Sequence, residues 1–280
     1  MRNNQRRLSG PGQNATPTPK APVSSASLSY QVPTEFVDLP SRGAFYPEGH
    51  PLHGQSSVEI RYMTAKEEDI LASTALIKNK LVLDRLFESL LVTEVDPSTL
   101  FIGDRSAIML AARISGYGNI YETKITCPNC GTKNDLLFDL EKATINQNCF
   151  DETFMEENSV NIDYSTNLLV VRPPVTNLKI GLRLLDSHAE REFSKLSSEN
   201  DERRITTALS AFIESVDGSY DRKEVEQFID NMPAKDSRYL RNIYAKLVPS
   251  VELKEDFTCK RCFHQKEMEV PLSAEFFWPR

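Results

Sequence analysis

Two cysteine pairs are the residues of this chain whose type and spacing most plainly define a chemistry. Cys127-Pro-Asn-Cys130 and Cys259-Lys-Arg-Cys262 are both C-x-x-C pairs, and residues 131–258 separate them. Each pair follows an extended-looking run that ends in threonine. Four thiolates from two such turns fill the tetrahedral shell of a zinc ion and leave no open position. The spacing therefore predicts a structural Zn2+ site that ties the middle of the chain to its C-terminal part.

Other interpretations of these cysteines stay open. A thioredoxin-like redox pair would place one C-x-x-C at the start of a helix, whereas both pairs here lie beside predicted strands. Two turns without metal are a further alternative, and His264 could replace one thiolate. Cys149 is left over, and we expect it to be a buried or unreactive thiol. Four paired cysteines among five fit a reducing compartment with metal better than a disulfide framework.

No catalytic arrangement accompanies the cysteines. The chain has no G-x-x-x-x-G-K-[ST] and no G-x-S-x-G motif. His50 and His53 lack partners at matched ligand spacing, so we expect surface histidines. His188 lacks the H-E-x-x-H spacing that would bring two imidazoles to one helix face. We therefore predict a non-enzymatic protein that has no catalytic residues and takes no small-molecule substrate.

Composition narrows the possible partners. The chain has 280 residues and a net charge of −7, from 33 basic and 40 acidic residues. The chain as a whole lacks the basic footprint of a nucleic-acid-binding protein. No apolar run approaches the roughly 20 residues that a spanning helix needs, which argues against membrane insertion.

The elements that must position the cysteines follow from hydrophobic periodicity and capping signals. A strand over 120–126 and a return run over 136–140 would form a hairpin with the first pair at its tip. Thr64 and Glu67 form a capping box that opens a helix, which we expect to run to Ile77 and to break at Lys78-Asn79-Lys80. Other expected strands cover 57–63, 160–164, 168–172, 180–185 and a run with Met268 and Val270. Further helices are expected around Leu83–Leu91, from Asp104 to Gly116, from Asp186 to Leu196, and over 205–216, 222–232 and 235–247, with 141–156 irregular.

These elements predict an α+β fold with helical subdomains around short antiparallel strands. A split four-cysteine zinc ribbon joins mid-chain and C-terminus. We expect a disordered, basic Ser/Pro-rich tail over 1–33, an N-terminal strand and helical subdomain over 34–118, and a zinc-ribbon domain over 119–280. A helical segment at about 186–247 is inserted between the two halves of the ribbon.

The C-terminal aromatics Phe276, Phe277 and Trp278 have two interpretations. Large aromatic side chains pack into a protein's own core by default. They could instead anchor a partner, because aromatic residues dominate interface hot spots.

Several segments, in this order, resemble one protein family. They are Leu39-Pro-Ser-Arg-Gly-Ala-Phe-Tyr-Pro47, Tyr62-Met-Thr-Ala-Lys-Glu-Glu-Asp-Ile-Leu71, the two cysteine pairs and Phe276-Phe277-Trp278. Over roughly residues 34–280 the chain resembles the baseplate hub and hub-assembly proteins of T-even-like contractile-tailed bacteriophages.

The resemblance implies a role in building the central hub of a phage tail baseplate through contacts with other hub and tail proteins. Such a protein would be found in the host cytoplasm during assembly, or in the virion if it stays in the tail. The resemblance carries over the four cysteines as metal ligands and gives no catalytic residues. The alternative function is that of a zinc-ribbon nucleic-acid-binding regulator, which would cluster basic residues such as Lys124, Lys133, Lys260, Arg261 and Lys266 around the cysteines.

Overall fold

The computed structural model describes residues 31–199, 203–270 and 274–277. The predicted tail over 1–33 lies almost wholly outside the described residues. The helices are α1 (Ala65–Ala72), α2 (Thr74–Lys78), α3 (Val82–Leu90), α4 (Ile102–Tyr117), α5 (Glu152–Glu157), α6 (Ser187–Glu199), α7 (Arg204–Phe212), α8 (Arg222–Asn231) and α9 (Ala234–Leu247). The strands are β1 (Thr34–Asp38), β2 (Ser57–Arg61), β3 (Ile120–Thr126), β4 (Lys133–Asp139), β5 (Thr144–Asn146), β6 (Asn161–Asp163), β7 (Leu168–Val171), β8 (Ile180–Leu182), β9 (Ile213–Val216), β10 (Ser250–Glu252), β11 (Lys254–Thr258) and β12 (Gln265–Glu269).

The mixed α and antiparallel β architecture agrees with the predicted fold class. Antiparallel pairing joins β1 to β2, β3 to β4, β5 to β10 and β11 to β12, and it orders a four-stranded sheet as β6-β7-β8-β9. Two apolar cores hold these elements together. The predicted domain boundary at residue 118 stays a prediction, and the first core contains side chains from both sides of it, among them Ile108 and Phe138.

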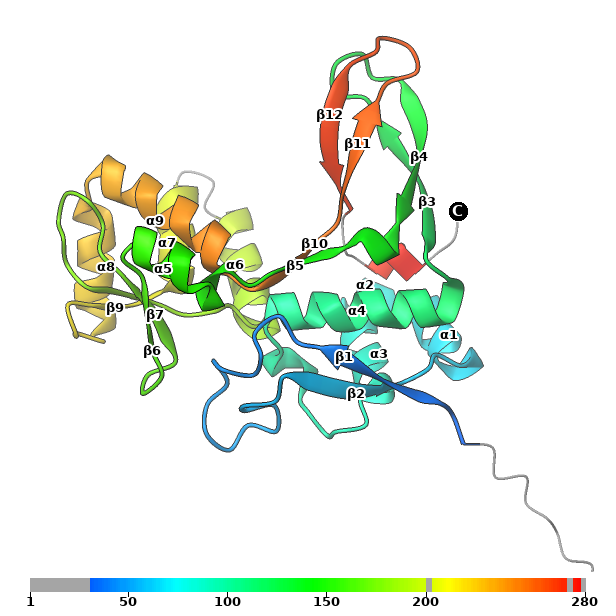
Figure 1. The fold of residues 1–280 in the computed structure, drawn as a ribbon, viewed down its shortest axis with the longest axis horizontal. Helices are drawn as coiled ribbons and strands as arrows, with labels where there is room; N and C mark the ends of the chain where they lie inside the picture. The colour runs from blue at the N-terminus through cyan, green and yellow to red at the C-terminus, as the bar shows by residue number, and fades with distance from the viewer. Residues whose placement is uncertain (1–30, 200–202, 271–273, 278–280) are drawn as a thin grey trace, which may run out of the picture. The chain divides into compact units, whose positions relative to one another are not determined.

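The first core is built around α4. Ile108, Met109 and Ala112 recur at helical spacing along one stripe of α4, and all three are fully buried. Figure 1 shows α4 lying between the β1–β2 ladder and the base of the β3–β4 hairpin. The capping box at the start of α1 is confirmed, because the Thr64 side chain caps the helix and its backbone N–H donates to Glu67.

Three boundaries of this helical part differ from the prediction. The first helix ends at Ala72, and Ser73, whose backbone is extended, caps a separate α2. Asp104 does not cap α4, because α4 begins at Ile102. The buried Asp104 carboxylate instead accepts a hydrogen bond from the Ser41 N–H. The helix closes at Gly118 rather than Gly116, because Gly118 adopts the positive φ of 84° that glycine tolerates best.

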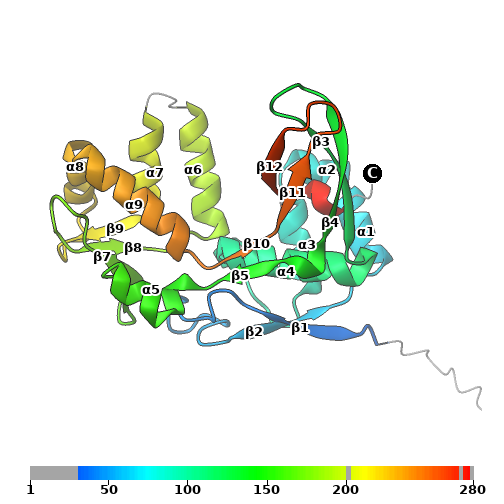
Figure 2. The same ribbon diagram turned by 45° about the horizontal axis from the view of Figure 1, so that its top comes forward.

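The second core packs the sheet β6-β7-β8-β9 against helices. Leu169, Ile180 and Ile213 of the sheet are fully buried, as are Leu240 and Leu247 of α9. Figure 2 shows α7, α8 and α9 gathered on this sheet. The α6 helix begins as predicted, because Asp186 accepts a hydrogen bond from the backbone N–H of Ala189.

Two predictions for this part were wrong. The expected helix over 205–216 ends at Phe212, and β9 continues as an edge strand paired with β8. Buried Ile213 and Ser215 alternate with more exposed neighbours there, which is the strand period. The segment 141–156 is not irregular, because it contains β5 and α5. The partner of β5 is β10, about one hundred residues away, so no local pattern announced it.

The loop that follows β1 connects the two cores. Phe45 packs in the second core, whereas its neighbour Tyr46 is buried in the first. Both side chains are at most 3% exposed, so they anchor this loop on both cores. The guanidinium of Arg191 on α6 also binds the carboxylate of Asp84 on α3 at 2.9 Å. These contacts bring the helical part of the second core against the first.

Candidate metal centre

Two hairpins present the four cysteines. In the β3–β4 hairpin the last pair before the turn is Thr126 with Lys133, and in β11–β12 it is Thr258 with Gln265. Each turn therefore holds one C-x-x-C pair at the hairpin's tip. Figures 1 and 2 show the two hairpins standing side by side on the first core. The strands that the sequence predicted around Cys127 and Cys130 are confirmed.

The two turns have the same backbone hydrogen bonds. The N–H of Cys127 donates to the carbonyl of Thr132, and that of Gly131 donates to the carbonyl of Cys127, both at 2.9 Å. In the second turn Cys259 donates to His264 at 2.9 Å, and Phe263 donates to Cys259 at 3.0 Å. The two C-x-x-C turns therefore share one pattern of backbone hydrogen bonds.

The sulfurs converge at distances that suit a metal ion. All four Sγ atoms lie within 4.8 Å of one another. Cys127 Sγ is 3.7 Å from Cys262 Sγ, and Cys130 Sγ is 3.6 Å from Cys259 Sγ. A zinc ion with four sulfurs at about 2.3 Å in a tetrahedron separates those sulfurs by about 3.8 Å. A disulfide would bring two of them to about 2.05 Å, and all four thiols are free.

The surroundings of the sulfurs favour thiolates at two positions. Backbone N–H groups of Cys262 and Arg261 point at Cys259 Sγ and lower the pKa of that thiol to about 6. The Thr132 hydroxyl, 3.3 Å from Cys130 Sγ, lowers the pKa of Cys130. Burial raises the pKa of Cys127 to about 11. Metal binding requires deprotonated sulfur, so an ion would displace the proton of Cys127.

Asn134 is a residue of this site that the sequence did not reveal. Its side chain is buried between the two hairpins. Its Nδ2 donates to the Thr132 carbonyl at 2.8 Å and lies 3.7 Å from Cys259 Sγ, and its Oδ1 accepts from the Lys260 N–H at 2.8 Å. An asparagine at an inward strand position carries no motif, so only the structure shows that it joins the two turns.

A small apolar cluster supports the centre from below. Phe257 is buried with Cys127 and Cys259, and Ile125, Leu136 and Met268 pack on them. These side chains come from all four strands. The cluster is small, so the ribbon has little apolar burial of its own to hold the two hairpins together.

The other titratable candidates lie elsewhere. His264 uses its backbone carbonyl in the second turn and is not among the converging ligands. Cys149 lies in the second core, where burial raises its pKa to about 12. The ring of His50 stacks on Tyr46 and bonds to Thr99, and His53 bonds to the Tyr46 carbonyl. Within the described residues, the four cysteines are the one group of His, Cys, Asp or Glu side chains placed closely enough to hold a metal ion.

The C-terminal aromatics pack inside the protein as far as the structure describes them. Phe276 and Phe277 are fully buried in the first core, and Arg113 Nε donates to the Phe276 carbonyl at 3.2 Å. Their proposed use as a partner anchor therefore does not fit this structure, because neither ring is accessible. Trp278 lies outside the described residues.

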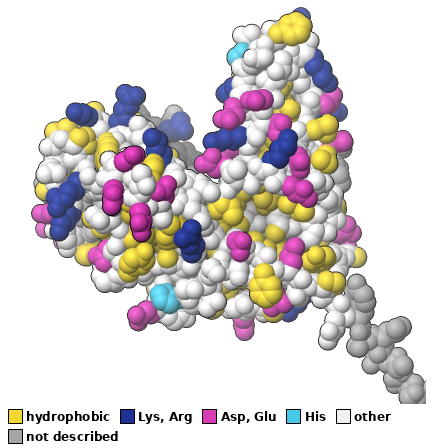
Figure 3. Space-filling view, in the orientation of Figure 1, with side chains coloured by type: hydrophobic (Ala, Val, Ile, Leu, Met, Phe, Trp, Pro, Cys, Tyr) yellow, Lys and Arg dark blue, Asp and Glu magenta, His cyan; other side chains and the backbone are white. Residues whose placement is uncertain are grey.

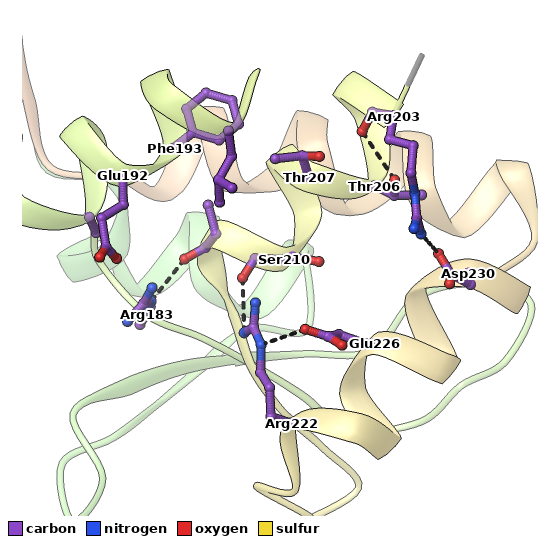
Figure 4. Close-up of a pocket in the computed structure, with 13 residues that line it drawn as sticks. Arg183, Glu192, Phe193, Arg203, Thr206, Thr207, Ser210, Arg222, Glu226 and Asp230 are labelled. Carbon is purple, nitrogen blue, oxygen red and sulfur yellow. Dashed lines mark hydrogen bonds and ion pairs between the residues drawn. The ribbon is translucent and has the colours of Figure 1, made fainter. Parts of the chain in front are cut away.

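A polar pocket between α6, α7 and α8 contains three arginines (Figure 4). Arg203 binds Asp230, and Arg222 Nε binds Glu226 at 3.1 Å. Arg183 Nε donates to the Ala211 carbonyl at 2.8 Å and lies 3.5 Å from Glu214. Each guanidinium already has an acidic partner, and Arg222 also donates to the Ser210 carbonyl of α7 at 3.1 Å, so the network connects α7 to α8.

The fold and the site define a class of protein: an α+β protein in which two hairpins bring four cysteine sulfurs together at distances compatible with a metal ion. A family model described as T4 bacteriophage base plate protein matches residues 34–278, and the chain belongs to this family. The resemblance noted in the sequence is thereby confirmed. No curated protein and no solved structure matches the chain. Among the described helices, none combines the length and apolar character needed to cross a bilayer.

Proposed function

We propose that this protein acts without catalysis in building the central hub of a contractile-tail baseplate, either as a hub subunit or as an assembly factor. The observation that carries the proposal is the family match, which spans the chain from β1 to beyond η5, the short 3-10 helix Ala274–Phe277. Its partners would be other hub and tail proteins. It would be found in the host cytoplasm during assembly, and in the virion if it remains in the tail.

The metal centre supports this proposal. We propose that Cys127, Cys130, Cys259 and Cys262 hold one structural Zn2+. Four sulfurs occupy every position of a tetrahedral ion, and catalytic zinc sites keep one position for water or substrate. An ion held in this way would lock the two hairpins into one ribbon. The ribbon would then be a rigid element on which contacts with partner proteins can be built.

A phage with this gene deleted tests the function. We expect infected cells to lack complete baseplates by electron microscopy and to recover them when a plasmid supplies the parent protein. Normal tails from the deletion phage would contradict the proposal. Mass spectrometry of purified particles beside the lysate separates the two roles. A fixed ratio to tail proteins identifies a hub subunit, and presence in the lysate alone identifies an assembly factor.

A further inference from the structure

One residue at the tip of the ribbon combines backbone strain with exposure. Phe263 follows Cys262 and adopts a positive φ of 57°. Its side chain is 77% exposed, the highest exposure of the large hydrophobic side chains that the structure describes. A bulky residue in the left-handed region is an outlier, and strain of this kind concentrates at functional sites.

The first turn provides an internal comparison. Gly131 occupies the same place after Cys130, with a φ of 69° and the same hydrogen bond back to the first cysteine. Glycine reaches this conformation without a steric penalty. The turn therefore requires no aromatic residue at this place. Phe263 adds no described ring contact within the chain, so its presence points to a contact outside the chain.

The surface around Phe263 is basic although the chain is acidic. Within 127–133 and 258–266 the charged residues are Lys133, Lys260, Arg261 and Lys266, with no Asp or Glu, and all four are exposed. Lys260 Nζ lies 3.5 Å from Asp135, a contact that is open to solvent. Figure 3 shows hydrophobic, basic and histidine side chains together at the free end of the ribbon.

We propose that this tip, Phe263 with Lys133, Arg261 and Lys266, docks into an apolar recess rimmed by Asp and Glu on another baseplate protein. The inference rests on the proposed function and deepens it by naming the contact surface and the partner's chemistry. An aromatic anchor in a pocket, surrounded by complementary charge, is the usual composition of an interface hot spot.

Charge favours a protein partner over nucleic acid. With a divalent ion bound, four thiolates would leave two negative charges at the tip, which would offset about half of the four basic side chains. Affinity for nucleic acid depends on many phosphate contacts, and a stacking platform uses several aromatic rings. The tip offers one ring and a small surplus of positive charge. Both features suit a single acidic pocket better than a phosphate backbone.

The test uses the deletion phage with full-length protein supplied from a plasmid. Phe263→Gly copies the first turn, so we expect metal content and melting temperature at or above those of the parent. We expect phage yield to fall at least tenfold. Phe36→Ala removes a side chain that is 73% exposed on β1, and this control should rescue like the parent. Full rescue by Phe263→Gly overturns the tip inference and leaves the proposed function standing.

A photo-crosslinker identifies the partner directly. Benzoylphenylalanine at position 263 keeps an aromatic ring there, so this readout does not depend on the stability of the glycine variant. We expect a crosslink in infected cells to an Asp/Glu-rich surface of a baseplate protein. A crosslink to nucleic acid, to a second copy of this chain or to no baseplate protein overturns the inference. Normal tails from the uncomplemented deletion phage would instead refute the proposed function.

Discussion

Replacing Asp104 should detach the loop that connects the two cores. The Asp104 carboxylate is fully buried near the start of α4. It accepts hydrogen bonds from the Ser41 N–H at 2.9 Å, the Ser41 hydroxyl at 2.5 Å and the Tyr46 hydroxyl at 2.8 Å. These donors belong to the loop whose Phe45 and Tyr46 enter different cores. The contact therefore holds both cores in place through one side chain.

The expected loss follows from the three donors. A buried donor left without an acceptor costs about 1–3 kcal/mol. The Ser41 and Tyr46 hydroxyls can turn, and each already accepts a second bond, from the N–H groups of Gly43 and Phe101. We therefore expect Asp104→Ala to reduce the free energy of unfolding by about 3–5 kcal/mol, near the low end of that range for three donors. Asp104→Asn keeps the volume and one acceptor, so its loss should be about half as large.

Urea unfolding followed by circular dichroism, together with hydrogen exchange, measures this prediction. The midpoint should fall in the order parent, Asp104→Asn, Asp104→Ala, and the Ser41 amide should lose its protection. Burial raises the pKa of Asp104. A raised folded-state pKa means that acidification from pH 7 towards 4 does not weaken this contribution. An Asp104→Ala protein within 1 kcal/mol of the parent would refute the reasoning.

Other contacts make separate predictions. Burial opposes ionisation of Glu67, but hydrogen bonds from Ser89 and Thr64 lower its pKa below 4.5. The ionised Glu67 therefore adds to the free energy of unfolding above pH 4.5, and this stabilisation is lost as the pH falls through the folded-state pKa. Glu67→Gln should destabilise the protein by about 1–2 kcal/mol at pH 7. Urea titrations should show that the difference in unfolding free energy between parent and variant becomes smaller in acid. An equal difference at pH 7 and in acid would contradict this. A Cβ at Gly103 would lie 2.0 Å from the Pro249 carbonyl, whereas at Gly116 of the same helix it would meet the Met63 sulfur at 3.3 Å. Gly103→Ala should therefore lower the melting temperature, and Gly116→Ala should leave it unchanged or raise it, since alanine favours helix by about 1 kcal/mol. The reverse order would show that α4 does not approach β10 so closely.

Local signals predicted the elements that carry their own chemistry. The capping box at Thr64, the aspartate cap at Asp186 and the two C-x-x-C turns each lie within a few residues of the element that they define. Long-range pairing was not predictable in this way. Strand β5 depends on β10, and Asp104 matched a helix cap by type although its partners are Ser41 and Tyr46.

The same difference between local signals and long-range contacts applies to the candidate metal site. The spacing of the cysteines predicted which side chains would converge, because two matched turns can complete one tetrahedral shell. The link through Asn134 depends on how the two hairpins face each other. The positive φ of Phe263 arises within its own turn, at the place that Gly131 occupies in the first turn, and a phenylalanine there gives no sequence signal of it. The burial of Phe276 and Phe277 in the first core is the default that large aromatic side chains predict, and it confirms that interpretation for these two residues.

Metal analysis of the purified full-length protein tests the central claim most directly. We expect one Zn2+ per chain, with X-ray absorption showing four sulfurs at about 2.3 Å. Cys259→Ser should lose most of that zinc and melt at a lower temperature, because the ribbon has little apolar core to replace it. A protein that contains no metal, and whose Cys259→Ser variant melts like the parent, would contradict the account.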